Sequence, residues 1–256
     1  MNGEPFLAWP GRAHLRRAAL LGLADTLWFL AVYAGADRLT ALRAYRVAVH
    51  FPAELRLPFV PGMTVFYMSL YGLFLLAPFV LRTAREFRAA AVAVAAAIAV
   101  AGIGFLLFPA ELAFPPAPEE RLGIWTGLYH LADRLNLTYN LLPSLHVAFA
   151  VICVAIFSPR APRPARAALW LWAALIAAST VLIHQHHVLD ALTGAALGLV
   201  AVRTVYRRLL ARPGGLSTSS ARGSGTKDAS PRSRHASTGG SRGSGDRGDG
   251  PCGGGS

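Results

Sequence analysis

Three histidines and an aspartate lie close together in the segment STVLIHQHHVLD, residues 179–190, where an apolar run ends. Residues four positions apart share one face of a helix, so His186 and Asp190 are expected to be in contact. The carboxylate then accepts a proton from one imidazole nitrogen and leaves the other nitrogen free. An imidazole held in this way acts as a nucleophile, a general base or a metal ligand.

A second candidate catalytic histidine, His146, lies in the segment NLLPSLHVAFA, residues 140–150. Pro143 and Ser144 are typical of a helix start, which puts His146 in the first turn of that helix. The first backbone N–H groups of a helix have no intrahelical partner and favour anions. The sequence therefore predicts a phosphate cradle at residues 143–146.

The elements that position these residues are predicted to be transmembrane helices. Of the 256 residues, 54% are hydrophobic and 15% are charged, and the mean hydropathy is +0.43, which is too apolar for an ordinary soluble domain. A bilayer core about 30 Å thick needs roughly 20 apolar residues of helix. Six charge-poor runs fit, the fourth of them rather short: 18–35, 63–81, 89–108, 142–157, 167–183 and 187–206. The expected fold is an all-α, polytopic six-helix bundle, with Tyr67, Ser69 and Tyr71 of the second run beside the core.

The arginines indicate how the bundle is oriented. The formal net charge is +12, but the arginines cluster between the apolar runs, at 12–17, 82–88, 160–166 and 203–208, so a nucleic-acid partner is not predicted. By the positive-inside rule, both termini and the even-numbered loops are cytoplasmic. Both candidate histidines then reach the outer leaflet of a cell membrane.

Three regions follow from this reading: a cytoplasmic N-terminus (1–17), the six-helix domain (18–211) and a cytoplasmic tail (212–256). The tail consists largely of Gly, Ser, Arg and Asp, which cannot bury enough surface to offset chain entropy, so it is predicted to be disordered. Cys153 and Cys252 are too far apart in this topology to form a disulfide. The single lysine among 25 basic residues indicates a GC-rich bacterial genome.

Three alternatives stay open at this point. The segment HQHH resembles part of a histidine-rich metal box, and a zinc site made of His184, His186, His187 and Asp190 is one alternative to a metal-free site. A non-catalytic transporter or scaffold, in which the same polar groups line a path or join helices, is the second. The third concerns the first apolar run, which ends in AVYAGA and could be a cleaved signal peptide.

Both motifs resemble those of a known family. PSLH at 143–146, and ST followed after five residues by His186 and after three more by Asp190, resemble the type 2 phosphatidic acid phosphatase superfamily. Leu145, Thr180 and the segments LPFVP and FLLFPA resemble the branch of inositolphosphotransferases and inositol phosphorylceramide synthases. The resemblance implies a helical membrane enzyme that acts on a lipid phosphate or a phosphorylated head group, without a metal or other cofactor.

The resemblance also implies a role for each motif residue. His186 is expected to attack the phosphate ester and form a phosphohistidine, while Asp190 orients His186 and His146 protonates the departing alcohol. A second acceptor then takes the phosphoryl group. Water as acceptor gives a phosphatase, and a hydroxyl, such as that of inositol or a lipid, gives a transferase.

The chain departs from the family pattern in its phosphate ligands. The family's first motif, a lysine followed by Arg-Pro, has no match, and Thr180 stands where many members have arginine. Guanidinium contacts to the phosphate would then come from the third loop, where Arg121 and Arg134 are the candidates. The other predicted phosphate contacts are Ser144, Ser179 and Thr180.

Overall fold

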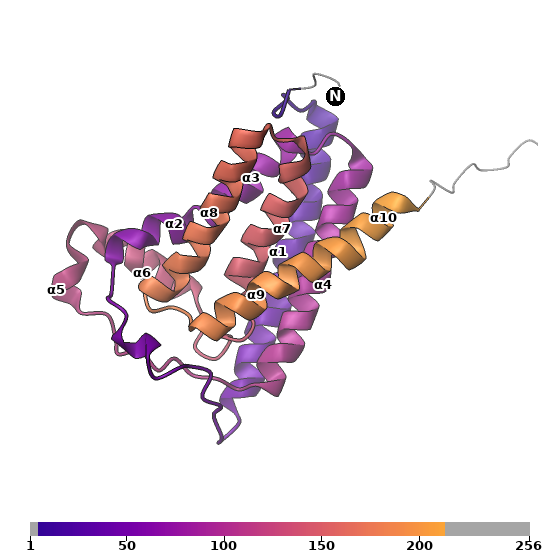
Figure 1. Ribbon diagram of the computed structural model, residues 1–256. Helices are drawn as coiled ribbons and strands as arrows, with labels where there is room; N and C mark the ends of the chain where they lie inside the picture. The colour runs from indigo at the N-terminus through magenta and orange to yellow at the C-terminus, as the bar shows by residue number, and fades with distance from the viewer. Residues whose placement is uncertain (1–4, 213–256) are drawn as a thin grey trace, which may run out of the picture. The chain divides into compact units, whose positions relative to one another are not determined.

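The fold is seen in a computed structural model, which describes residues 5–212 and shows them as a set of packed helices (Figure 1). The α-helices are α1 (Arg12–Ala41), α2 (Thr64–Met68), α3 (Leu70–Val80), α4 (Ala84–Leu107), α5 (Glu119–Leu122), α6 (Thr126–Leu135), α7 (Leu145–Phe157), α8 (Arg163–Leu182), α9 (Val188–Ala201) and α10 (Arg207–Ala211). The remaining turns are η1 (Glu54–Arg56), η2 (Pro61–Met63), η3 (Gly123–Trp125), η4 (Ser158–Arg160) and the π-helical η5 (Val202–Tyr206). Within these residues the one β-type pairing is an isolated bridge between Val47 and Ala110. The predicted all-α fold is confirmed, and the tail beyond Arg212 lies outside the described residues.

Every apolar run predicted to cross the membrane is helical. Five helical stretches are long and apolar enough to span a bilayer: Arg12–Ala41, Pro61–Val80, Ala84–Leu107, Arg163–Leu182 and Val188–Ala211. The fourth run forms the shorter apolar helix Leu145–Arg160. The structure therefore supports five spans by length and composition, where the sequence predicted six.

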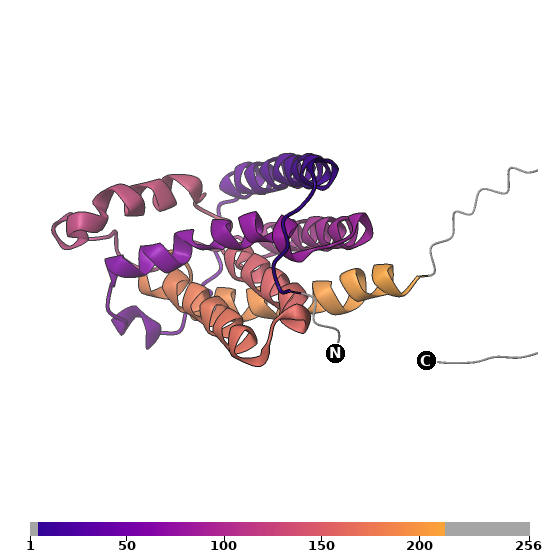
Figure 2. The ribbon, with the colours of Figure 1, turned by 90° about the horizontal axis from the view of Figure 1, so that it is seen from above.

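The short helix α7 lies at the centre of the bundle. It packs against α3, α4, α8 and α9, and eleven of its thirteen residues are buried. Seen from above, α7 lies between α4, α8 and α9, while α1 lies outside, against α4 (Figure 2). Because its neighbours surround it, α7 does not need the full length of a lipid-facing span.

One end of the bundle is formed by the arginine-rich connections. Thr83 begins α4 with a reciprocal cap, in which its hydroxyl accepts the Glu86 N–H and the Glu86 carboxylate accepts the Thr83 N–H. Glu86 also pairs with Arg160 of the α7–α8 connection. Arg85 donates to the Leu209 and Leu210 carbonyls of α10. These contacts gather the 81–84, 158–163 and 207–212 segments at the same end, as the predicted alternation requires.

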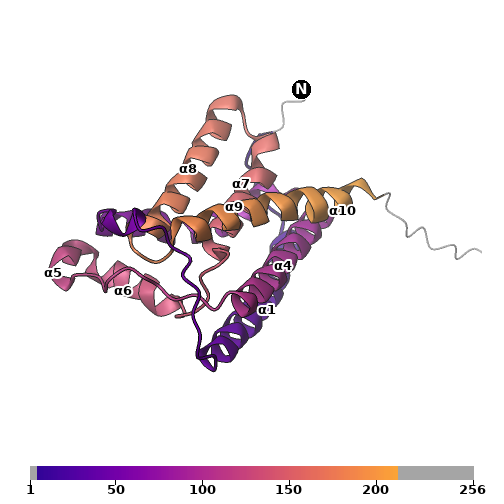
Figure 3. The ribbon, with the colours of Figure 1, turned by 60° about the horizontal axis from the view of Figure 1, so that its bottom comes forward.

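The loops that carry the histidines meet at the opposite end. The Val47 N–H donates to the Pro109 carbonyl at 3.0 Å, and the Val60 N–H donates to the Leu182 carbonyl at 2.9 Å. The short helices α5 and α6 lie at this end together with α2 (Figure 3). The sequence did not predict α6, because its ten residues are amphipathic and too short to form an apolar run.

Two glycines let α9 approach α7 closely. A Cβ at Gly194 would collide with the Ser144 carbonyl, and a Cβ at Gly198 would lie 2.6 Å from the Ala148 carbonyl oxygen. Small residues four apart are a common device for bringing two membrane helices into backbone contact. The Ser144 N–H donates to the Asp190 carbonyl at 3.0 Å, which joins the start of α7 to the first turn of α9.

Candidate active site

His186 lies in a tight turn between two long helices. Helix α8 ends at Leu182 and α9 begins at Val188, and the Thr180 carbonyl accepts the N–H groups of both Gln185 and His186 at 3.0 Å. The sequence placed His186 on the sixth helix itself. In the structure it precedes that helix by two residues, because the turn has left the helical path at His184, whose φ is +57°.

The expected contact between His186 and Asp190 is nevertheless present. Nδ1 of His186 lies 3.4 Å from Oδ2 of Asp190, and both side chains are buried. The same Oδ2 accepts the backbone N–H of His187 at 2.8 Å. A carboxylate beside Nδ1 leaves Nε2 of His186 with a free lone pair.

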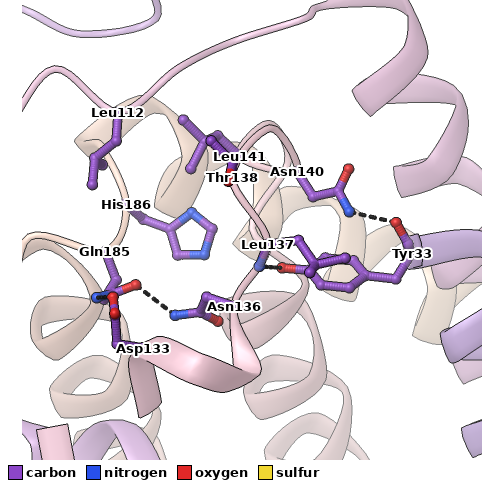
Figure 4. Close-up of a pocket in the computed structure, with 10 residues that line it drawn as sticks. All are labelled: Tyr33, Leu112, Asp133, Asn136, Leu137, Thr138, Asn140, Leu141, Gln185 and His186. Atoms are coloured by element: carbon purple, nitrogen blue, oxygen red, sulfur yellow. Dashed lines mark hydrogen bonds between the residues drawn. The ribbon is translucent and has the colours of Figure 1, made fainter. Parts of the chain in front are cut away.

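His186 opens onto a cavity of about 260 Å³. Figure 4 shows its ring projecting among the other lining side chains. The lining residues are Tyr33, Leu112, Asp133, Asn136, Leu137, Thr138, Asn140, Leu141, Gln185 and His186. Three of them carry neutral amides, one carries a carboxylate, and no arginine or lysine is among them.

His146 lies in the first turn of α7. Its ring stacks on that of Tyr67 at 3.8 Å between centroids, and its Nε2 lies 3.1 Å from the Tyr67 carbonyl oxygen. Because a carbonyl only accepts hydrogen bonds, Nε2 must carry the proton, and Nδ1 is the nitrogen left for other chemistry. His146 is not a lining residue of the cavity.

A chain of hydrogen bonds connects the surroundings of the two histidines. The Tyr67 hydroxyl donates to Asn136 Oδ1 at 2.7 Å, and Asn136 Nδ2 donates to Gln185 Oε1 at 2.6 Å. Gln185 Nε2 in turn donates to Asp133 Oδ1 at 3.1 Å. Asn136 and Gln185 were not predicted as site residues from the sequence. For Gln185, its position between His184 and His186 in HQHH was a sequence feature that indicated a place near the site.

None of the five predicted phosphate ligands is among the residues that line the cavity. Ser144 is fully buried and caps α7, since its hydroxyl accepts the Val147 N–H at 3.4 Å. The hydroxyls of Ser179 and Thr180 donate to carbonyls one turn back in α8, at 2.6 and 2.8 Å. Arg121 and Arg134 are exposed on α5 and α6 and do not line the cavity.

The remaining histidines of this end have protein partners or neighbours. The His184 ring stacks on Phe114 at 4.1 Å, and its Nε2 lies 3.3 Å from the Leu57 carbonyl oxygen. Burial lowers the pKa of His184, and burial also lowers that of His187 despite the carboxylates of Asp190 and Glu54 nearby.

The structure also shows the surroundings of His50 and His130, and it bears on the zinc alternative. The ring centroid of His50 lies 5.3 Å from that of His187. His130 lies at the surface, 3.2 Å from Glu119. Among residues 5–212, no group of three or more His, Cys, Asp or Glu side chains is arranged to hold a metal ion.

These features define a class of protein: a helical membrane protein with a buried histidine–carboxylate pair and a second histidine at the same end of its bundle. The family model of the PAP2 superfamily matches residues 34–204, and the chain belongs to that superfamily. A search of curated proteins and a search of solved structures each found no match. Membership supports a phosphatase or phosphoryl-transfer function on lipid-type substrates.

Proposed function

We propose that the protein is a phosphoryl-transfer enzyme that uses His186 as nucleophile, Asp190 to orient it and His146 as general acid and base. The observation that carries the proposal is the 3.4 Å contact between His186 Nδ1 and Asp190 Oδ2, inside a matched phosphatase family. The carboxylate fixes the ring with Nε2 toward the cavity and stabilises the positive charge that the ring gains on reaction.

In the first step, Nε2 of His186 attacks the phosphorus of a phosphate ester. The bond from phosphorus to the alcohol oxygen breaks as the new nitrogen–phosphorus bond forms. His146 is protonated once the anionic phosphate is bound, because that charge stabilises the cationic ring, and it gives its Nδ1 proton to the departing oxygen. The products are a free alcohol and a phosphohistidine. The carbonyl of Tyr67, which accepts from Nε2, holds the His146 ring in place for this transfer.

In the second step, a hydroxyl compound or water attacks the phosphohistidine. His146, now neutral, takes the proton of the attacking oxygen at Nδ1 while the nitrogen–phosphorus bond breaks. Both histidines then return to their starting states. Asn136, Asn140, Gln185 and Asp133 line the cavity with hydrogen-bonding groups that suit the hydroxyls of a polyol acceptor, so we favour a transferase of the inositolphosphotransferase-like branch.

The charge of the cavity bears on the phosphate that it receives. Asp133 is ionisable and no cationic side chain lines the cavity, so a second negative charge on the substrate has nothing nearby to offset it. We therefore expect a singly charged phosphodiester lipid to react faster than a doubly charged phosphomonoester. For Arg121 and Arg134 to contact the phosphate, the segment with α5 and α6 must move when substrate binds.

The test is labelling of the purified protein in detergent with two lipids that carry ³²P, a phosphatidylinositol and a phosphatidic acid, with and without myo-inositol. We expect acid-labile, base-stable label on the protein and release of the lipid alcohol. His186→Asn should abolish both, and His146→Asn should slow turnover by about 10²–10⁴-fold, the usual contribution of a general acid.

The matched control is His130→Asn, which removes a surface histidine beside Glu119. It should label and turn over at the unmodified rate. Label that persists in His186→Asn excludes this residue as the nucleophile. In sealed vesicles that contain the protein, solute flux that persists at least in part in His186→Gln, with no turnover in any variant, favours the transporter alternative.

A further inference from the structure

A second carboxylate–histidine pair lies next to the first and takes no part in the mechanism above. Nδ1 of His187 lies 3.2 Å from Oε1 of Glu54, and both side chains are buried, with exposed fractions of 0% and 3%. Glu54 belongs to η1, in the loop before α2, about 130 residues from its partner in the chain. A buried carboxylate is costly unless it is paired and hydrogen-bonded, so this contact requires a physical account.

Glu54 accepts two backbone hydrogen bonds in addition to its contact with His187. Its Oε1 accepts the Phe51 N–H at 2.8 Å as well as facing His187. Its Oε2 accepts the Val188 N–H at 2.7 Å. Val188 is the first residue of α9, so the carboxylate also lies at the positive end of that fourteen-residue helix. Glu54 thereby joins the loop before α2 to the turn that carries His186.

The His187 ring is oriented by a hydrogen bond at Nε2 and by stacking on Phe114. Its Nε2 accepts the backbone N–H of Ala113 at 3.1 Å, so this nitrogen has no proton and the proton is on Nδ1, facing Glu54. Phe114 stacks on the same ring at 4.9 Å. The ring therefore has one orientation and one tautomer, set by two loops that are distant in sequence.

The held ring controls the position of Asp190. The backbone N–H of His187 donates to Asp190 Oδ2 at 2.8 Å, and this is the oxygen that faces Nδ1 of His186. A shift of His187 would therefore move the carboxylate that orients the proposed nucleophile. Neither Glu54 nor His187 lines the cavity.

We propose that Glu54 and His187 are positioning residues, which hold the His186–Asp190 pair in its reactive geometry from outside the substrate cavity. This inference rests on the proposed function of His186. Misplacing a reacting group by about 1 Å can cost on the order of 10²-fold in rate. Because the pair does not touch the cavity, its loss lowers kcat and leaves KM within about threefold.

The first experiment compares Glu54→Gln with Glu120→Gln, an exposed glutamate of α5 at the same end of the bundle. Glu54→Gln keeps the shape but has only one oxygen to accept the Phe51 and Val188 N–H groups, which the carboxylate accepts at separate oxygens. We expect kcat to fall about 10–100-fold with KM within threefold, and Glu120→Gln to match the unmodified protein. Unchanged kcat in Glu54→Gln, or a KM that rises as much as kcat falls, overturns the proposal.

The second experiment separates positioning from stability by rescue. His187→Asn keeps an N–H donor where Nδ1 was, whereas His187→Leu does not. The two variants are assayed at temperatures at which the same fraction of each is folded. Under these conditions we expect the kcat of His187→Asn to be severalfold higher than that of His187→Leu. Since the two residues act as one unit, Glu54→Gln combined with His187→Leu should lose no more than the worse single variant. Additive losses, or losses that follow unfolding alone, overturn the proposal.

The third readout does not depend on turnover. In ¹⁵N-labelled protein, long-range histidine correlation spectra should show one ring protonated on Nδ1 and not on Nε2, assigned by its loss in His187→Asn. Glu54→Gln should abolish that signature. If the signature behaves as expected but no phosphate ester is turned over, the proposed function fails while the pairing stands; if His187 shows the Nε2–H tautomer, the pairing itself fails.

Discussion

The turn before α9 concentrates unusual features in a few side chains. His184 is, among residues 5–212, the non-glycine residue with a positive φ, a left-handed conformation that costs an ordinary side chain roughly 1–2 kcal/mol. Stacking of its ring on Phe114 and the contact with the Leu57 carbonyl offset this cost. The strained residue lies two positions before His186, and strain of this kind is often found at sites that must be held in one conformation.

At this residue scale, the buried rings predict how stability depends on pH. Burial lowers the pKa of His184 and His187, so the folded protein binds fewer protons than the unfolded chain at mildly acidic pH. The free energy of unfolding is therefore highest above the ordinary histidine pKa of about 6.5 and falls as the pH drops below it. Thermal unfolding in detergent at pH 8, 7, 6 and 5 measures this.

His184→Asn tests the contribution of one ring. Asparagine tolerates the left-handed conformation better than most residues and does not titrate. We expect the melting temperature of this variant to fall less between pH 7 and pH 5 than that of the unmodified protein. A His184→Asn curve that parallels the unmodified one contradicts the prediction.

At the scale of elements, the site depends on how closely α9 lies against α7. The turn with His186 precedes α9, and His146 lies in the first turn of α7, so the distance between these helices sets the distance between the two histidines. Gly194 faces the Ser144 carbonyl, and Gly198 faces the Ala148 carbonyl one turn further on. The hydrogen bond from the Ser144 N–H to the Asp190 carbonyl needs this close approach.

A methyl group at either glycine should separate the two helices. We expect Gly194→Ala and Gly198→Ala each to destabilise the protein by about 1–3 kcal/mol, the usual cost of overpacking, and to lower turnover as well. The measurement is thermal unfolding in detergent, paired with the phosphoryl-transfer assay. The control is Gly22→Ala on α1, where an added Cβ meets no atom within 4 Å and helix propensity favours alanine.

At the scale of the whole molecule, the two ends of the described bundle differ in chemistry. One end gathers Arg85 and Arg160 with their neighbours and binds them to carbonyls and to Glu86. The other end holds the histidines, the buried carboxylates and the cavity. The positive-inside rule predicts that the arginine end is cytoplasmic and that the cavity faces outward.

This orientation is tested by single cysteines in a Cys252→Ser background, since the remaining Cys153 is buried. An impermeant maleimide applied to intact cells should label Glu120→Cys at the cavity end. It should label Pro162→Cys, at the arginine end, only after the cells are permeabilised. The reverse pattern would place the site on the cytoplasmic side.

Much of this molecule is readable from local sequence. The apolar runs determine the helices, because a polar backbone in lipid must satisfy its hydrogen bonds within each segment. The spacing from His186 to Asp190 predicts their contact even though His186 lies two residues before the first residue of the helix. Pro143 and Ser144 predict the start of α7, where Ser144 is the observed cap.

Tertiary structure alone decided which distant groups complete the site. Glu54 meets His187, and Asn136 meets Tyr67 and Gln185, across loops whose lengths and apolar content carry no periodic signal. Local sequence also did not predict that α7 lies at the centre of the bundle or that the arginines of α5 and α6 lie at the surface. Periodicity fixes which residues share a face of one helix, whereas contacts between loops arise only when the packing of the helices has brought their ends together.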